Sequence, residues 1–358
     1  MLDTAEAKGG DTVRVIDQKS QFLGQAHYSA ASQIALRMIS RGSHPIDIAA
    51  WIAAAQQFRE SVVTDSNAYR LVHAEADFLP ALIVDRYADV FAIQALDQAM
   101  DRALPEIAAA LEAQFAPRAL VARNDAAVRE LEQLPREIRV LAGQLDEPVT
   151  IRMNGFALRA DLLHGQKTGV FLDQRENYLA AARYARGSAL DCFTCTGGFA
   201  LHLGRACERV EAIDSSAAAL ATAQWNADTN TVPNIHFRED DVFEVLSRYS
   251  SARRNFDTVV LDPPAFAKSR KQLEGAMRGY KDINLRALRL LSPGGILVTC
   301  SCSHHVSEAM LLEVVAEASL DASRTLRVLE RRMQAQDHPV LLTVPETHYL
   351  KCLILQVC

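Results

Sequence analysis

Five apolar runs between residues 189 and 300, each followed by a helical pattern, decide the fold of this chain. They are ALDCF (189–193), RVEAID (209–214), NIHFRED (234–240), DTVVLD (257–262) and GILVTC (295–300). Apolar runs that alternate with helices predict parallel strands covered by helices on both faces. Right-handed crossovers then make a doubly wound α/β sheet, whose ligands bind at the carboxyl ends of the strands.

Two more strand-like runs follow, without a helix between them. These are RTLRVLERR (324–332) and HYLKCLILQV (348–357), and they predict an antiparallel hairpin on the same sheet. Five parallel strands plus such a hairpin are typical of class I methyltransferases and not of dinucleotide dehydrogenases.

The sequence before residue 151 predicts two further parts. Residues 12–42 form a small β unit, with alternating runs at Thr12–Asp17 and Gln33–Ile39 and Gly24 between them. Residues 43–150 predict a central α/β domain with helices over 46–61 and 98–115 and strands over 79–87, 90–96 and 118–124. We therefore expect three domains: 1–42, 43–150 and 151–358.

Composition narrows the class of protein. With 358 residues, 49% hydrophobic and 23% charged, the chain is expected to be a globular protein of two or three domains. No apolar run approaches the roughly 20 residues of a membrane helix, and the first residues lack a signal-peptide pattern. Seven cysteines without regular spacing favour reduced thiols and a cytoplasmic location. A net charge of -6 argues against binding nucleic acid by bulk charge, but leaves local basic clusters such as Lys268, Arg270 and Lys271.

The first βα turn, DCFTCTGGF (191–199), predicts a cofactor loop. Glycines at 197 and 198 let a ligand approach the backbone at a helix amino terminus, but the spacing is not G-x-G-x-x-G. Asp214 ends the next strand, where a carboxylate binds the ribose of either NAD or S-adenosylmethionine. Asp240 and Asp241 follow the third strand. We expect Asp241 to contact adenine, and the alternative is that it caps the next helix.

The turns after the fourth and fifth strands carry the chemistry. Asp262 is held by Pro263 and Pro264, and Cys302 follows one strand later. Carbon 5 of a pyrimidine becomes nucleophilic when a thiolate adds at carbon 6 and an acid at N3 takes up the developing charge. We expect Cys302 to be that thiol, because Cys300 lies where the strand is still running.

Other interpretations of these residues stay open at this point. Asp262 is otherwise a turn-capping acid, and both cysteines are otherwise ordinary buried thiols. Cys192, Cys195, Cys300 and Cys302 are also candidates for a zinc site, although C-x-C is not the usual knuckle spacing. We expect no metal.

The motifs resemble the bacterial large-subunit ribosomal RNA cytosine-C5 methyltransferase I family over nearly the whole chain. The specific ones are HGQKTG (164–169) with LDQR (172–175), and GYKDIN (279–284). Asp262-Pro263-Pro264, which alone would not be specific, and Ser301-Cys302-Ser303 accompany them. The resemblance implies an N-terminal PUA RNA-binding module, a central α/β domain and a methyltransferase domain. It implies S-adenosylmethionine as donor, a cytosine of 23S rRNA as target and Cys302 as nucleophile. The chain lacks the basic, Trp-containing stretch at the start of the family's module, so we expect either a shortened module or one with an unusual start.

The resemblance and the residue patterns together give the expected site. We expect the following residues to contact the cofactor: Gln174, Arg175, Asp191, Phe193, Thr196, Gly197, Gly198, Asp214, Ser215, Asp241, Asp262 and Pro263. We expect these to contact the substrate: Lys167, Pro264, Phe266, Lys268, Tyr280 and Lys281. Cys302 and Asp262 are the expected catalytic pair.

Three competing functions remain. A methyltransferase for exocyclic amines (N6 of adenine or N2 of guanine) also uses an Asp-Pro-Pro loop, but there an aromatic residue usually follows directly, whereas Ala265 intervenes here. A catalytically silent RNA-binding protein would retain the donor pocket. An NAD-dependent oxidoreductase disagrees with the glycine spacing and the hairpin. The sequence leaves the oligomeric state open.

Overall fold

The computed structural model describes residues 6–358 except 45, 166–169 and 268. Two candidate substrate residues, Lys167 and Lys268, lie outside the described residues. The chain divides into two compact units: residues 1–172 with 336–347, and residues 173–335 with 348–358. This division differs from the expected boundary at 150/151, because the hairpin at 149–160 pairs with the first unit. Asn67 and Arg152, for example, exchange hydrogen bonds of 2.7 and 3.0 Å.

The second unit contains one seven-stranded sheet in the order β13-β12-β11-β14-β15-β17-β16. The first five strands of the unit are mutually parallel, and β17 is antiparallel to both of its neighbours. The strands are β11 (Ser188–Cys192), β12 (Arg209–Asp214), β13 (Ile235–Glu239), β14 (Phe256–Leu261), β15 (Leu291–Ser301), β16 (Leu326–Arg332) and β17 (Lys351–Val357). The expected fold class is confirmed, and so is the antiparallel pair of strands at the end. Its strands are joined by residues 333–350 rather than by a tight turn.

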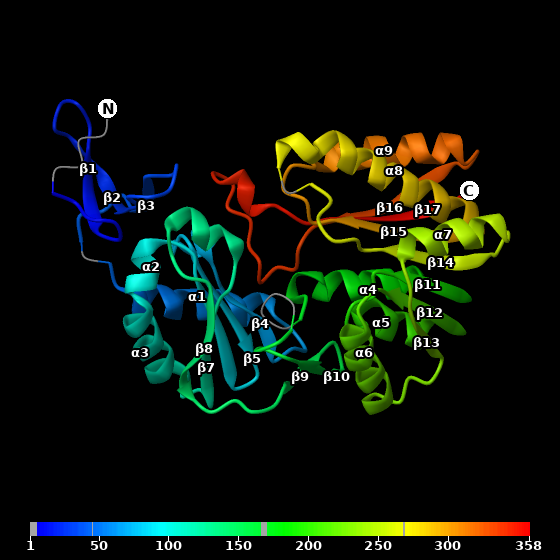
Figure 1. Ribbon diagram of the computed structural model, residues 1–358, viewed down its shortest axis with the longest axis horizontal. Coiled ribbons are helices and arrows are strands. Elements are labelled where there is room, and N and C mark those ends of the chain that lie inside the picture. The colour runs from blue at the N-terminus through cyan, green and yellow to red at the C-terminus, as the bar shows by residue number, and fades with distance from the viewer. Residues whose placement is uncertain (1–5, 45, 166–169, 268) are drawn as a thin grey trace. The chain divides into compact units, whose positions relative to one another are not determined.

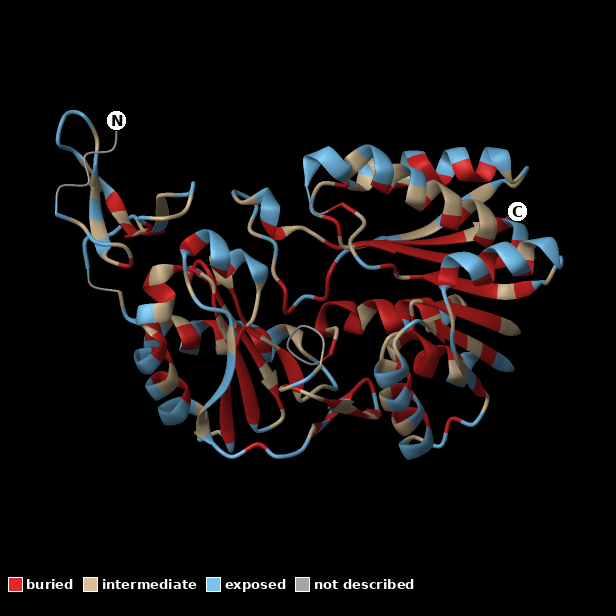
Figure 2. Ribbon diagram, in the orientation of Figure 1, coloured by how far each residue is buried: buried red, intermediate tan, exposed pale blue. Residues whose placement is uncertain are grey.

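Six helices among the described residues cover this sheet, three on each face (Figure 1). They are α4 (Arg175–Tyr184), α5 (Gly198–Ala206), α6 (Ala217–Thr229), α7 (Val242–Ser251), α8 (Leu273–Leu290) and α9 (Glu308–Asp321). Helices α4 to α6 lie on one face and α7 to α9 on the other. The central strands β11, β14, β15 and β17 are buried along most of their length (Figure 2), which explains their nearly continuous apolar sequences, whereas the edge strands β13 and β16 are largely accessible. Val259 and Leu261 of β14 pack in one core with Ile283 of α8 and Leu355 of β17.

The first unit contains three sheets. They are the small antiparallel sheet β1 (Thr12–Ile16), β2 (Phe22–Tyr28) and β3 (Leu36–Ser40), the five-stranded sheet β4 (Ala68–His73), β5 (Leu82–Tyr87), β6 (Val90–Ala95), β7 (Ala119–Asn124) and β8 (Glu137–Gly143), and the hairpin β9 (Val149–Met153) and β10 (Phe156–Ala160). The five-stranded sheet packs against α1 (Ile48–Val62), α2 (Gln98–Arg102) and α3 (Leu104–Phe115). The single helix expected over 98–115 was wrong. It is divided at Ala103, because Pro105 lies in the first turn of α3 and cannot donate a backbone hydrogen bond.

Candidate active site

The Asp-Pro-Pro turn and the Ser-Cys-Ser turn lie side by side. Asp262 follows β14 and Cys302 follows β15, and these two strands are parallel neighbours. The Cys302 thiol donates a hydrogen bond to the carbonyl oxygen of Pro263, with 4.0 Å between the sulfur and oxygen atoms. Residues 39 positions apart in sequence are therefore in contact at the ligand edge of the sheet.

The two cysteines of the fifth strand have different surroundings. Cys300 is fully buried within β15, opposite Cys352 of β17, and burial raises the pKa of its thiol well above the ordinary value. Cys302 lies beyond the strand end and is partly exposed. The expectation that Cys300 points into the interior is confirmed, and it leaves Cys302 as the accessible thiol of the pair.

A chain of side chains orients Asp262. Gln174, at the start of α4, donates its amide to Oδ1 of Asp262 at 3.0 Å. Asn177 donates to the Gln174 carbonyl oxygen at 2.6 Å, and Arg332 of β16 donates to Asn177 at 2.9 Å. Gln174 and Asn177 are buried. The sequence pointed to Gln174 through its motif, but no local signal marked Asn177 or Arg332 as part of the same site.

A second network of hydrogen bonds supports the turn that carries Cys302. Ser301 donates its hydroxyl to Tyr280 Oη at 2.9 Å, and Tyr280 Oη lies 3.2 Å from Ser303 Oγ. Ser303 Oγ in turn accepts the amide of Ala267 at 3.3 Å. Tyr280 is completely buried, so the structure gives it a supporting position in place of the expected substrate contact. The ammonium of Lys281 pairs with Glu317 and Asp321 of α9, at 3.1 Å from each, and its substrate contact stays a prediction.

Lys351 was not expected in the site at all. It begins β17 opposite Ser301, and its Nζ donates to the carbonyl oxygens of Ser303 and Tyr349, both at 2.8 Å. The side chain belongs to a residue only 3% exposed, and burial lowers its pKa to about 8. One sequence signal was present: Lys351 is the only charged residue of the run KCLILQV, and a lysine within a buried strand is rare.

The glycine loop between β11 and α5 has an unusual backbone. Phe193, Cys195 and Gly197 all have positive φ angles, 64°, 49° and 85°. These residues bend the loop at the amino terminus of α5, and the amides of Thr194, Cys195 and Gly197 are bonded within the protein to Ile213, Asp214 and Thr194. Glycine is needed at 198 for space, because a Cβ atom there would lie 2.5 Å from the Tyr178 hydroxyl oxygen.

The acid at the end of β12 supports this loop. Asp214 accepts the Cys195 amide at 2.8 Å on one oxygen and the Ser216 amide at 2.9 Å on the other. Each carboxylate oxygen has a second lone pair, so these bonds leave room for the expected ribose contact. Ser215, beside it, is exposed. Asp241 caps α7 by accepting the Glu244 amide at 3.0 Å, which is the alternative role, and its adenine contact stays a prediction.

The acids of the site fit a cationic cofactor. Asp191, at the end of β11, is 1% exposed and accepts the Thr194 hydroxyl at 2.6 Å. Burial, with a smaller contribution from the nearby Asp262, raises the pKa of Asp191 to about 7, against the effect of the Thr194 bond. A cation bound beside Asp191 would stabilise its carboxylate form. The sulfonium and ammonium groups of S-adenosylmethionine meet this requirement.

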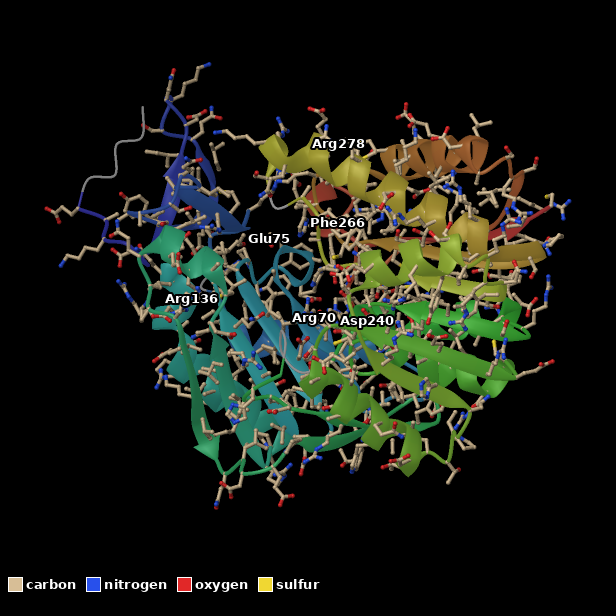
Figure 3. The ribbon with its side chains drawn as sticks, turned by 45° about the vertical axis from the view of Figure 1, so that its right-hand side comes forward. Arg70, Glu75, Arg136, Asp240, Phe266 and Arg278 are labelled. Atoms are coloured by element: carbon tan, nitrogen blue, oxygen red, sulfur yellow. The ribbon has the colours of Figure 1, made fainter. Side chains whose placement is uncertain are left out.

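A pocket of about 450 Å³ opens beside the Asp-Pro-Pro turn. Its walls include Phe243 of α7, Phe266 of the turn, and Lys271 and Arg278 near the start of α8 (Figure 3). The rings of Phe243 and Phe266 lie 5.9 Å apart, and Phe266 packs on Tyr280 at 4.7 Å. Aromatic faces next to cations are suited to binding a nucleobase and its phosphate.

The described residues contain neither a metal-binding cluster nor a membrane-spanning helix. No group of three or more His, Cys, Asp or Glu side chains is arranged to hold a metal ion. No helix in that part of the chain is both long and apolar enough to span a membrane.

Comparison with known proteins identifies relatives over nearly the full length. The profile of the S-adenosylmethionine-dependent methyltransferase family matches residues 81–355, and a PUA-like domain profile matches residues 2–41. The chain is 40% identical to the "Ribosomal RNA large subunit methyltransferase I" of Shewanella denitrificans, over 99% of this chain and 92% of that protein. It is 38% identical to the protein of the same name from Erwinia tasmaniensis, over 97% and 90%.

Solved structures agree with the fold. SMU.776, classed as a methyltransferase and crystallised with SAH, superposes with a TM-score of 0.84 at 19% identity, over 98% of this chain and 92% of that one. An S-adenosylmethionine-dependent methyltransferase from Agrobacterium tumefaciens superposes with a TM-score of 0.57 at 17% identity, over 82% and 90%.

Proposed function

Because the chain belongs to the ribosomal RNA large subunit methyltransferase I family, we propose that it methylates carbon 5 of a cytidine in 23S ribosomal RNA. The reaction uses S-adenosylmethionine and passes through a covalent bond between Cys302 and the base. The observation that carries this proposal is the contact between the Cys302 thiol and Pro263, which brings a thiol and an acid to one edge of the sheet.

The donor site lies around the glycine loop. Asp191, Phe193, Thr196, Gly197 and Gly198 surround the amino terminus of α5. Further donor contacts are proposed from the ends of the neighbouring strands and from α4: Asp214, Ser215, Asp241, Pro263, Gln174 and Arg175. When bound there, S-adenosylmethionine supplies an electrophilic methyl group.

The residues of the two turns divide the work on the base. The Cys302 thiolate adds to carbon 6, and Asp262 donates a hydrogen bond or proton at N3, which makes carbon 5 nucleophilic. Carbon 5 takes the methyl group, a base removes the carbon-5 proton, and the C6–S bond breaks to release the thiolate. Gln174 fixes the carboxyl of Asp262 through its bond to Oδ1, so the acid is oriented before the base arrives.

The substrate side is proposed to lie along the pocket beside α8. Phe266 lines this pocket, and Pro264, which follows the residue that Cys302 contacts, is proposed to meet the base. Lys271 and Arg278 of the pocket offer cations for the RNA backbone. An enzyme of this kind acts on an unstacked base, and the Phe243 and Phe266 rings provide surfaces for stacking. The PUA-like residues 2–41 are proposed to bind RNA.

The covalent step is tested with RNA that contains 5-fluorocytidine. Fluorine at carbon 5 replaces the proton that a base must remove before the C6–S bond can break. The Cys302 adduct should therefore accumulate and resist denaturation. Cys302→Ala should form no adduct and lose methylation by at least about a hundredfold, because removal of a nucleophile costs several powers of ten.

The matched control is Cys358→Ala, which removes an exposed thiol outside the site and should form the adduct normally. Adduct formation by Cys302→Ala would disprove the assignment, and full methylation by that variant would exclude a covalent mechanism. Methylation of an exocyclic amine instead, seen by nucleoside mass spectrometry, would favour the amine-methyltransferase alternative.

A further inference from the structure

Lys351 is a buried cation with no acidic partner. Its Nζ makes two hydrogen bonds, both to neutral carbonyl oxygens, and no carboxylate of the described residues lies within ion-pair distance. A buried ammonium without a counter-charge is costly, so a lysine in this position either loses its proton or faces an anion supplied by the site.

The anion available is the thiolate of Cys302. One of the two carbonyls held by Lys351 belongs to Ser303, the next residue after Cys302. The backbone of Lys351 also lies opposite Ser301 in the β15–β17 pairing, so the lysine is fixed next to the residue before Cys302 and bonds to the residue after it. The charge of Cys302 raises the pKa of Lys351, against the larger effect of burial.

We propose that Lys351 is the counter-ion of the Cys302 thiolate, holding that sulfur ionised and its turn in place before attack on the base. This inference rests on the proposed role of Cys302. Lys351 acts through Cys302 and does not touch the base, so it is a positioning residue. Once Cys302 has lost the proton that its thiol directs at the Pro263 carbonyl oxygen, the thiolate and the ammonium form a pair. When the sulfur adds to carbon 6, the negative charge leaves it and the pair is broken, and it forms again when the C6–S bond breaks.

Other titratable groups surround this pair and enter any pH dependence. His304, next to the cysteine turn, stacks on Tyr349 at 5.6 Å, and burial together with the charges of Lys351 and His305 lowers the pKa of its ring. The remaining groups are Tyr280 under the turn, Asp262 across from it, and Asp173, which accepts the Tyr349 hydroxyl at 2.8 Å. Neither Asp173 nor Asp262 lies within ion-pair distance of Lys351 among the described contacts.

The test measures thiolate directly, without RNA. The pH dependence of iodoacetamide alkylation at Cys302 is followed by mass spectrometry of its peptide, in the full chain, with exposed Cys358 of the same molecule as internal reference. Lys351→Gln can still donate to the Ser303 carbonyl but carries no charge. We expect its alkylation rate at Cys302 near pH 7 to fall about tenfold, with a midpoint about one pH unit higher, and Cys358 to be unchanged.

The variants separate charge from packing. Lys351→Arg should keep a midpoint near that of the wild type, whereas Lys351→Met should behave like Lys351→Gln. If folded Lys351→Gln shows the same pH dependence of Cys302 alkylation as the wild type, the proposal is overturned. This holds even if the variant loses methylation, because Lys351 would then act as a base and not as a counter-ion. If the uncharged variants do not fold, the wild-type protein provides the test. The proposal is overturned if the pH midpoint for alkylation of Cys302 is at or above the midpoint for Cys358. A low Cys302 midpoint without a 5-fluorocytidine adduct would instead reject the proposed function.

Discussion

At the scale of single residues, the donor loop holds two buried titratable groups with opposite pH effects. Burial raises the pKa of Asp191 to about 7 and lowers the pKa of His202, beneath Gly198, to about 4. The folded state therefore keeps a proton on Asp191 that the unfolded state releases between pH 3.8 and 7, so stability falls as pH rises through that range. For His202 the unfolded state binds the extra proton between pH 4 and 6.5, so stability rises with pH there. The two effects offset each other.

Replacing His202 with Gln should reveal how much this histidine contributes to the pH dependence of the unfolding free energy. The difference in unfolding free energy between wild type and variant should be constant above pH 6.5. It should shrink by up to about 3 kcal/mol as pH falls to 4, because the wild type must protonate or expose the buried ring. Urea denaturation at several pH values measures it. His236→Gln, at an exposed position of β13, is the control, and a similar pH trend there would contradict the explanation.

Some residues of the site could be predicted from the sequence, and others could not. Asp262 and Cys302 were recognisable because each directly follows a buried strand, and strand ends meet at one edge. Asn177, Arg332 and Lys351 were not, because they come from elements whose neighbours depend on sheet order. A lysine in an apolar strand signals a buried charge, but its partner is visible only once β17 is placed beside β15.

At the scale of elements, apolar runs in the sequence predict where the strands lie more readily than they predict where helices begin and end. The five parallel strands were predicted because buried strands are apolar throughout. Strand β8 was missed because it pairs on one side, with β7, and exposes Ile138 and Val140, so its pattern resembles a loop. Helix α8 begins at Leu273, earlier than its apolar stretch indicated, because its first turns face the pocket.

The cap of α7 gives a test at this scale. Asp241→Ala should lower stability by about 1 kcal/mol through loss of the bond from the Glu244 amide, whereas Asp241→Ser retains a capping oxygen and should lose little. Both variants lose the carboxylate expected to contact adenine. Thermal unfolding measures the cap, and calorimetric titration with S-adenosylmethionine measures the contact.

Ser307→Ala is the matched control, since Ser307 caps α9 through the Met310 amide outside the donor site. It should lose similar stability and keep donor affinity. If Asp241→Ser binds the donor as tightly as the wild type, Asp241 is a helix cap only, and its adenine role is withdrawn.

At the scale of the whole molecule, a net charge of -6 means that RNA must be bound through local basic surfaces. The PUA-like module offers exposed cations at Arg14 and Lys19. Phosphate contacts release counter-ions, so each one adds to the salt dependence of binding.

The double variant Arg14→Ala, Lys19→Ala should therefore bind RNA more weakly, with the slope of log affinity against log salt reduced by about 1.4. Affinity for S-adenosylmethionine should not change. Fluorescence anisotropy over a series of salt concentrations measures the slope.

The control is the double variant Arg205→Ala, Arg209→Ala, with the same change in charge. These residues lie at the end of α5 and the start of β12, away from the carboxyl ends of the strands. An equal loss of slope in both double variants would show that only total charge matters and would reject a role for the module.

The position of β17 has a consequence for biosynthesis. It is the last strand of the sheet to leave the ribosome, yet it fills the place between β15 and β16 and carries Lys351. A nascent chain that has emerged only as far as β16 leaves β15 with an unpaired edge, which is prone to pairing with other chains. The sheet thus cannot close before β17 has emerged, and the cysteine turn acquires its lysine only as this strand inserts. Premature termination after the fifth parallel strand would yield an aggregating protein rather than a partly active one.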